Sequence, residues 1–302
     1  MFSQDSRLLT LLTGALLLRP TLGALEFEIG DGLKQISDKA WASASSSPNA
    51  TGSVALSGYN VSQEWPGESI SGWSLDLKVM ADVPSKNVDD KFYTGLTFSL
   101  SAPDELQTKQ DNGSTILQLD NSTNSTWAVC MTIISHLPEE TIKDGYDDDG
   151  SCYAMLGEKC VDALKAQAVS ESACGLKALL PDGCDQRWFG ANSFYVPLDS
   201  PDLLSDALVS VAADKPHDKG NTTEYESAVK HTYPVIVGWN GHRVDGAAGV
   251  QSGDMTEMMC LRANKITKGS QEVDMDDDSA ASRGPLAATW AVIAGMVFTA
   301  LL

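Results

Sequence analysis

The sequence predicts a mainly β protein: an antiparallel β-sandwich interrupted by a disulfide-stapled helical insertion. Three observations predict it: segments in which apolar and polar residues alternate, a central region with helical spacing, and cysteines concentrated in and around that region. The alternation is clearest where Trp73, Leu75, Leu77 and Val79 would share one face of a half-buried strand. Short strands separated by Gly, Pro, Asn and Asp are typical of a sandwich. We expect them at residues 53–59, 73–83, 91–100, 114–120, 126–134, 193–198, 232–239 and 257–266.

The helical insertion is predicted at about residues 152–212. Residues 157–169 and 170–180 combine helical apolar spacing with good helix formers, and Pro181 would end the second of these helices. These elements differ from the strands around them in both spacing and composition, so they predict an insertion in the sandwich.

A third helix is predicted at residues 200–212, with Ser200 as its N-cap and Pro201 in its first turn. With this helix included, residues 25–268 would form one sandwich ectodomain that contains the insertion. A body of this length suits a single domain of this kind.

Residues 1–24 have the three parts of a secretory signal peptide. A polar start with one basic group precedes an apolar run of eleven residues at 8–18, and Gly23 and Ala24 are small residues suited to cleavage. The apolar run is too short to span a bilayer, and it is apolar all round, whereas a core helix would be amphipathic. We therefore expect the chain to enter the secretory pathway and to lose this segment.

The C-terminal residues have the order of a glycolipid-attachment (GPI-anchor) signal. Residues 269–285 form an acidic stalk in which either Asp278 or Ser279 is a suitable attachment residue. The apolar tail at residues 286–302 would be removed when the anchor is attached. A transmembrane helix is the alternative, since seventeen apolar residues are the lower limit for crossing a bilayer. A transmembrane helix is usually followed by Lys or Arg on the cytoplasmic side of the membrane. No such residue follows this tail, and this favours the lipid anchor.

The six cysteines predict disulfide bonds rather than a metal site. An even number behind a signal peptide indicates an oxidising compartment, and no Cys-x-x-Cys pair or neighbouring histidine indicates zinc. The number of possible pairings is about fifteen. We expect Cys130 to join Cys260, because both lie in apolar, strand-like segments that are far apart in the chain. The other expected pairs are Cys152 with Cys160 and Cys174 with Cys184.

Asn-x-Ser/Thr triplets are dense in the region between the two processing signals. Such a triplet is an acceptor for N-glycosylation in a secreted chain, and a glycosylated residue must lie at the surface. The triplets therefore predict a glycoprotein and mark exposed loops. They begin at Asn49, Asn60, Asn112, Asn121, Asn124 and Asn221.

The chain is strongly acidic, with a formal net charge of −20. Processing would remove Arg7, Arg19 and Arg283 together with Asp5, which takes the charge to about −22. A domain this acidic repels nucleic acid, and the sequence has neither a basic patch nor a glycine-rich phosphate loop. We therefore expect no nucleic-acid partner and no cofactor.

The sharpest local feature is the acidic turn at residues 144–152. Asp147 and Asp149 imitate part of a calcium loop, in which several carboxylate oxygens converge on a hard cation. The pattern fails at both ends, because Gly145 and Leu156 stand where the first and last ligands belong. The favoured interpretation is a solvated turn next to a disulfide.

Two tryptophans are candidate sugar-binding residues, because aromatic rings stack on the apolar faces of pyranoses. Trp65 and Trp239 both lie in sequences typical of turns, so we expect partial exposure. Packing in the core remains the more frequent role of such rings. Glycoside hydrolysis needs two carboxylates at a set separation, but with forty-one acidic residues the sequence cannot select a pair.

Taken together, the signal peptide, the triplets, the Cys130–Cys260 framework and the Ser279-Ala280-Ala281 segment resemble those of filamentous-fungal, GPI-anchored cell-surface glycoproteins. The resemblance implies a place on the plasma membrane or cell wall, and it implies no reaction. We therefore expect a non-enzymatic surface glycoprotein, adhesive or in contact with cell-wall polysaccharide. The alternative is an anchored carbohydrate-active enzyme that remodels the wall.

Overall fold

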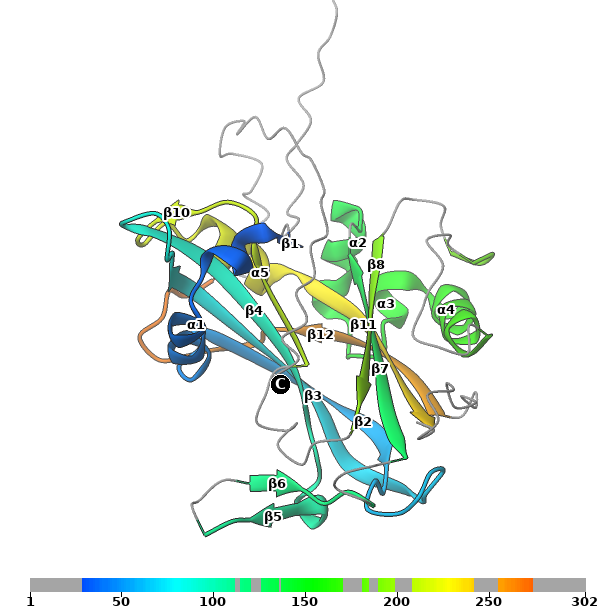
Figure 1. The fold of residues 1–302 in the computed structure, drawn as a ribbon. Helices are drawn as coiled ribbons and strands as arrows, with labels where there is room; N and C mark the ends of the chain where they lie inside the picture. Colours follow the sequence, from blue (N-terminus) through cyan, green and yellow to red (C-terminus); the bar gives the residue numbers. More distant parts are fainter. Residues whose placement is uncertain are drawn as a thin grey trace, which may run out of the picture.

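Two antiparallel β-sheets form the framework of the protein (Figure 1). The computed structural model describes residues 29–111, 115–120, 126–135, 137–170, 181–184, 190–198, 208–241 and 255–273. The larger sheet has the strand order β1 (Ile29–Gly30), β9 (Val209–Ala213), β4 (Lys91–Ser101), β3 (Ser69–Pro84), β2 (Ala50–Tyr59) and β13 (Lys265–Ile266), and β10 (His217–Asp218) pairs with β4. The smaller sheet has the order β12 (Thr256–Arg262), β11 (Thr232–Gly241), β7 (Trp127–Ser135) and β8 (Gly190–Pro197). A separate hairpin pairs β5 (Gln107–Lys109) with β6 (Thr115–Leu117).

Short helices lie outside the two sheets. The α-helices are α1 (Asp38–Ser45), α2 (Glu139–Asp144), α3 (Tyr153–Leu156), α4 (Glu158–Ser170) and α5 (Thr223–Lys230). The 3-10 helices are η1 (Asp31–Gln35), η2 (Asp104–Leu106) and η3 (Gly145–Asp147).

The predicted alternation in β3 is confirmed. Trp73, Leu75, Leu77 and Val79 are all 1% exposed or less, whereas the residues between them are partly exposed. Since successive side chains on a strand point to opposite faces, this segment buries one face in the core and leaves the other nearer solvent.

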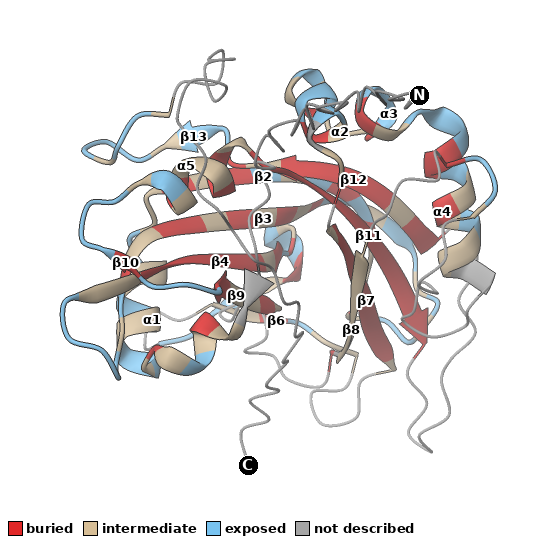
Figure 2. Cartoon of the chain, turned by 90° about the horizontal axis from the view of Figure 1, so that it is seen from above, coloured by how far each residue is buried: buried red, intermediate tan, exposed pale blue. Residues whose placement is uncertain are grey.

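The main core lies between the two sheets and is rich in aromatic rings. Trp73 of the larger sheet meets Trp239 of the smaller sheet edge-on, with ring centroids 4.8 Å apart. Phe98 and Tyr233 make a similar contact at 5.5 Å. At one side the sheets come so close that a Cβ on Gly52 of β2 would lie 1.9 Å from the carbonyl oxygen of Arg262 on β12. The fold is thus a sandwich with a close backbone contact between β2 and β12 (Figure 2).

The outer face of the smaller sheet is covered by α2, α3 and α4 (Figure 1). Ile142, Met155 and Leu164 of these helices form a second buried cluster with Ile236 and Met258 of the sheet. Both faces of β11 are therefore covered, and all its residues are buried. A strand covered on both sides is mostly apolar and is buried without alternation, as β11 is throughout and β7 is up to Ile134.

The outer face of the larger sheet is covered at one end by η1 and α1. The ring of Trp41 of α1 packs directly on Gly95 of β4. A Cβ at this glycine would come within 2.7 Å of the ring. Met80, Tyr93 and Ala212 complete this smaller cluster.

The structure confirms most of the predicted elements and corrects others. The strands at 53–59, 73–83, 91–100, 126–134, 193–198 and 232–239 and the helix at 157–169 all have counterparts, whereas of 114–120 only Thr115–Leu117 is strand. The single strand predicted at 257–266 is two strands, β12 in the smaller sheet and β13 in the larger. The predicted helix over 200–212 is wrong at its C-terminal half, because Val209–Ala213 forms strand β9 between β4 and β1. β-Branched valines alternate there, and pairing with β4 overrides the local helical pattern.

Other predictions fall partly or wholly outside the described residues. Residues 1–28, 171–180, 199–207 and 274–302 are among those that the structure does not describe. The signal peptide, nearly all of the predicted helix at 170–180, and the attachment residues Asp278 and Ser279 therefore lie outside the described residues. Of the helices that are described, none is long and apolar enough to cross a membrane.

Candidate functional site

One disulfide joins the helical insertion to the smaller sheet, and a second lies within the insertion. Cys152, which precedes α3, is bonded to Cys260 of β12, and Cys160 of α4 is bonded to Cys184. The predicted Cys152–Cys160 pair is therefore wrong, and so is the predicted pairing of Cys174 with Cys184. The first bond links residues 108 positions apart, so it ties the acidic turn to the end of the sandwich.

The predicted bond between Cys130 and Cys260 is also wrong, because strand β11 separates them. Cys130 lies opposite Gly238 of β11, and Cys260 lies opposite Pro234. Across the sheet, the two cysteines are thus separated by two strand spacings, about 10 Å. Along the strand direction they are offset by four residues, about 13 Å. A disulfide needs Cα atoms within about 7 Å of each other. Cys130 is nevertheless disulfide-bonded, and Cys174 lies outside the described residues.

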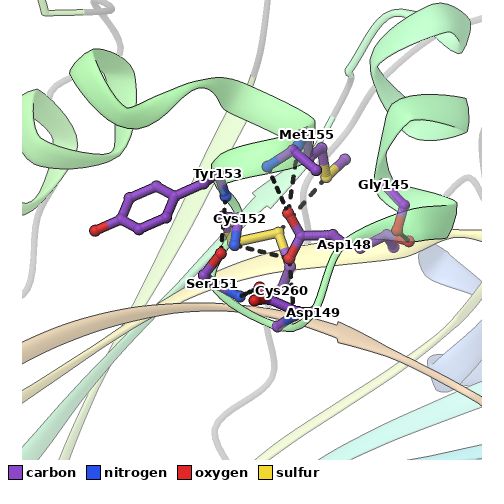
Figure 3. Close-up of a disulfide and its surroundings, with 11 residues drawn as sticks. Gly145, Asp148, Asp149, Ser151, Cys152, Tyr153, Met155 and Cys260 are labelled. Carbon is purple, nitrogen blue, oxygen red and sulfur yellow. Dashed lines mark hydrogen bonds between the residues drawn. A yellow bond between two sulfur atoms is a disulfide. The ribbon is translucent and has the colours of Figure 1, made fainter.

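Asp148 organises the acidic turn (Figure 3). Its Oδ1 accepts hydrogen bonds from the backbone N–H groups of Gly150 and Cys152, both at 2.8 Å. Its Oδ2 accepts from the N–H groups of Ala154 at 3.0 Å and Met155 at 3.3 Å. The first turn of a helix has backbone donors without partners inside the helix. One carboxylate therefore holds the turn and the start of α3 together.

The same turn is tied to two strands of the smaller sheet. The carbonyl of Gly150 accepts a hydrogen bond from the N–H of Cys260 at 2.9 Å. The Thr232 hydroxyl of β11 donates to the carbonyl of Gly145 at 3.2 Å. Cys152 has a left-handed backbone with a φ of 66°, a conformation that non-glycine residues rarely adopt. Hydrogen bonds and a disulfide therefore hold a conformation that local preference alone would not select.

In the acidic turn, the carboxylates of Asp148 and Asp149 accept hydrogen bonds from nearby backbone N–H groups. Asp149 accepts from the N–H of Ser151 at 3.0 Å, and hydrogen bonds from Ser151 hold the pKa of this exposed carboxyl below its usual value. Asp147 is exposed. In the described part of the chain, no three or more His, Cys, Asp or Glu side chains are grouped so that they could hold a metal ion. Sequence reasoning singled out Asp147 and Asp149 and missed Asp148, whose position shortly before a helix was the available signal.

Trp239 is a core residue, and its predicted partial exposure is wrong. It is 1% exposed, and its indole nitrogen donates to the carbonyl of Ser57 at 3.3 Å. The glycine-rich sequence that follows suggested a turn, but β11 continues through Gly241. Trp239 therefore cannot stack on a sugar.

Trp65 is partly buried at the end of the sandwich. Its backbone N–H donates to the hydroxyl of Thr126 at 2.8 Å, and the bond to Pro66 is cis. Its ring lies against Gly241, where a Cβ would come within 2.9 Å. The indole nitrogen is shielded from solvent and has no hydrogen-bond partner among the described residues. The ring thus packs against the end of β11, and the predicted partial exposure of Trp65 is confirmed.

Three of the predicted glycosylation triplets lie in the described residues. Asn221 is exposed, and Asn60 is partly exposed in the turn after β2. Asn49 is also partly exposed, but it lies directly before β2 rather than in an exposed loop. Asn112, Asn121 and Asn124 lie outside the described residues.

A titratable cluster that the sequence did not reveal surrounds His217 of β10. Its side chain is 5% exposed. Nδ1 lies 3.0 Å from the carbonyl oxygen of Asp218 and 3.7 Å from Oδ1 of Asp82. Nε2 lies 3.5 Å from the hydroxyl of Thr94. Because a carbonyl can only accept, Nδ1 is a protonated nitrogen.

Burial raises the pKa of the nearby Glu224, and the charges of His217 and Lys215 partly oppose this shift. A histidine with two carboxylates and a hydroxyl is a constellation used in catalysis. The hydroxyl of Thr94, however, belongs to a fully buried residue, and it donates to the carbonyl of Ala81 at 3.3 Å. The contacts of His217 therefore hold β10 against β4 through Thr94 and against β3 through Asp82.

Comparison of the chain with protein-family models, with curated proteins and with solved structures found no match.

Proposed function

We propose that the protein is a non-enzymatic glycoprotein of the cell surface or cell wall, delivered by the secretory pathway and held by a lipid anchor. The observation that carries the proposal is the disulfide framework. Cys152–Cys260 and Cys160–Cys184 are formed, and Cys130 is bonded as well. Disulfides of this kind form and persist in oxidising compartments and on cell surfaces.

The positions of Asn60 and Asn221 support a glycoprotein. Both lie in turns at the surface, where a glycan can be carried without disturbing the sheets. The last described residues support an anchored body: after β13 the chain lies at the surface, and the acidic stalk with Asp278 and Ser279 follows in the sequence.

Tyr153 is the side chain we propose for contact with wall polysaccharide. It is 47% exposed, and it points away from the disulfide (Figure 3). The rigid turn around Asp148 holds it in place, and a preorganised ring loses little entropy when it stacks on a sugar. Replacement of Tyr153 by Ala should lower retention of the pure protein on insoluble wall polysaccharide. Val88→Ala is the matched control, since Val88 is equally exposed at another place. Equal retention of both variants would contradict this contact.

The alternative, an anchored carbohydrate-active enzyme, would need aromatic rings along a groove. Trp73, Tyr233 and Trp239 are instead packed between the sheets. No feature of the described residues favours that alternative.

The location is tested by treating intact cells with phosphatidylinositol-specific phospholipase C. We expect release of the full-length chain from the surface, and secretion without treatment of a chain truncated before residue 286. Replacement of Asp278 and Ser279 by bulky residues should abolish anchoring and leave folding intact. Retention of the full-length protein in the membrane pellet after treatment would support a transmembrane tail instead.

A further inference from the structure

The three described triplets use their asparagine side chains in different ways. In Asn221 the carbonyl oxygen Oδ1 accepts a hydrogen bond from the N–H of Thr223 at 3.2 Å. In Asn60 it accepts from the N–H of Ser62 at 3.2 Å and from its hydroxyl at 2.6 Å. Both are local turns of the kind that asparagine forms with the backbone two residues on. Within the described residues, Nδ2 of either side chain has no hydrogen-bond partner and remains available.

Asn49 uses both atoms of its carboxamide in long-range contacts. Oδ1 accepts from the N–H of Ala81 at 2.8 Å, and Nδ2 donates to the hydroxyl of Ser270 at 3.2 Å. The first bond satisfies a backbone N–H of β3 just beyond the end of its ladder with β2, where the last pair is Ala50 with Val79. An unpaired backbone N–H at the end of a ladder would otherwise need water or another acceptor.

The backbone of Asn49 makes further contacts with distant segments. Its carbonyl accepts from the N–H of Thr267 at 2.8 Å and from the hydroxyl of Tyr225 at 3.5 Å. The Tyr225 hydroxyl also lies 3.3 Å from the carbonyl of Gln271. We call Asn49, Ala81, Tyr225, Thr267 and Ser270 the Asn49 junction. It joins the start of β2, strand β3, helix α5 and the segment after β13.

N-Glycosylation acts on the nitrogen that this junction uses. The transfer forms a bond between Nδ2 and the anomeric carbon of the first sugar. It breaks the bond between that carbon and a lipid-linked pyrophosphate donor, and it releases the lipid pyrophosphate and one amide proton. A bulky glycan on Nδ2 of Asn49 would lie where Ser270 closes on the junction. On Asn60 or Asn221 it would extend into solvent.

We propose that, of these three triplets, Asn60 and Asn221 carry glycans and Asn49 stays unmodified in the folded protein. This inference rests on the proposed passage through the secretory pathway. Ser270 is 221 residues from Asn49 in the chain, so the junction closes only after synthesis is nearly complete. A chain glycosylated early on Asn49 cannot close it and is lost from the secreted population.

The direct test is mass spectrometry of peptides from the secreted protein after enzymatic deglycosylation in heavy-oxygen water. We expect the mass increase of deamidation in the peptides with Asn60 and Asn221, and none in the peptide with Asn49. A modified Asn49 in the folded protein, or an unmodified Asn60 and Asn221 beside other modified triplets, would overturn the inference. If no triplet in the chain were modified, the proposed secretory route itself would fail.

Two substitutions separate the acceptor role of Asn49 from its structural role. Thr51→Val destroys the triplet and keeps both Asn49 and a β-branched strand residue, so we expect unchanged mass and melting temperature. Asn49→Gln displaces the carboxamide, and we expect the melting temperature to fall by about 4 °C with no change in glycan mass. Asn221→Gln is the matched control: it should remove one glycan and leave melting nearly unchanged. A loss of glycan mass in Thr51→Val would refute the inference even if Asn49→Gln failed to fold.

Discussion

The outer faces of the two sheets are covered in different ways. On the smaller sheet the cover consists of short helices and an acidic turn. Cys152–Cys260 bonds this cover to the sheet, and Cys160–Cys184 lies within the cover. On the larger sheet, η1 and α1 are held by packing around Trp41 and by hydrogen bonds, with no cystine among the described residues of that cover.

The difference follows from the length of the helices in each cover and from how well they pack against their sheet. Helices α2 and α3 have six and four residues, and helices this short are unstable in isolation. Helix α1 is also short, but its tryptophan fills a space left by Gly95. The cover on one face of the molecule thus depends on disulfides as well as packing, whereas the cover on the other depends on packing without a described disulfide.

The largest effect is expected from removing the Cys152–Cys260 disulfide. Closing a loop of roughly a hundred residues stabilises a fold by about 4.7 kcal/mol. Replacement of both cysteines by Ala should therefore lower the free energy of unfolding by about 4 kcal/mol in urea titrations. Hydrogen exchange should increase in α3 and α4 well before it increases in α1. Equal loss of protection in all three helices would break the distinction between the two covers.

The reciprocal change is Trp41→Ala. Loss of a large, partly buried ring should lower the free energy of unfolding by about 3 kcal/mol. The same hydrogen-exchange measurement should now show faster exchange in α1 and an unchanged α4. A reducing agent should act on this variant as it does on the native protein, because the altered cover contains no described cystine.

A smaller effect is expected from Asp148→Ala. Its carboxylate accepts four backbone hydrogen bonds, and the loss of a capping acceptor of this kind costs about 2 kcal/mol. Asp149→Ala is the matched control, since the exposed Asp149 carboxylate is bonded to the neighbouring Ser151 and not to the start of α3, and we expect a change of less than about 0.5 kcal/mol. Similar losses in the two variants, measured by urea unfolding, would mean that Asp148 does not organise the turn.

At neutral pH the smallest effect is expected at Tyr225 of α5, where the change appears only in alkaline solution. Burial, together with the charge of Glu226, raises the pKa of Tyr225 from 10.0 to about 12. Below pH 10 the phenol is neutral in both the folded and the unfolded state, so its contribution to stability is fully present. Between pH 10 and 12 only the unfolded state ionises, and stability falls. Tyr225→Phe should lessen this fall and lose only its hydrogen bonds at neutral pH. An identical pH profile for both proteins would show that Tyr225 does not ionise on unfolding.

Much of the strand pattern could be predicted from local sequence. Alternation placed β3 correctly, and helical spacing placed α4, because in both cases the local pattern agrees with the face that is buried. β9 could not be predicted in the same way. Its residues suit a helix by spacing, and pairing with β4 together with the alternating Val209 and Val211 makes them a strand.

The candidate sites were less predictable than the fold. Cys130 and Cys260 were expected to pair because both lie in apolar strands, but the interposed β11 is a property of the sheet order. Trp239 was expected near a turn, yet β11 continues past it. Asn49, Asn60 and Asn221 all begin an Asn-x-Ser/Thr triplet. They are distinguished only by the groups that their side chains contact in the fold.

The sequence by itself determined that this protein is built mainly of antiparallel strands with a helical insertion, because burial of one face leaves a period that can be read along the chain. Only the tertiary structure decided which cysteines are bonded, that Asp148 rather than its neighbours organises the acidic turn, and that Asn49 belongs to a junction. Each of these depends on groups brought together from distant parts of the chain, or on a turn geometry that those groups impose, and no local pattern records such proximity.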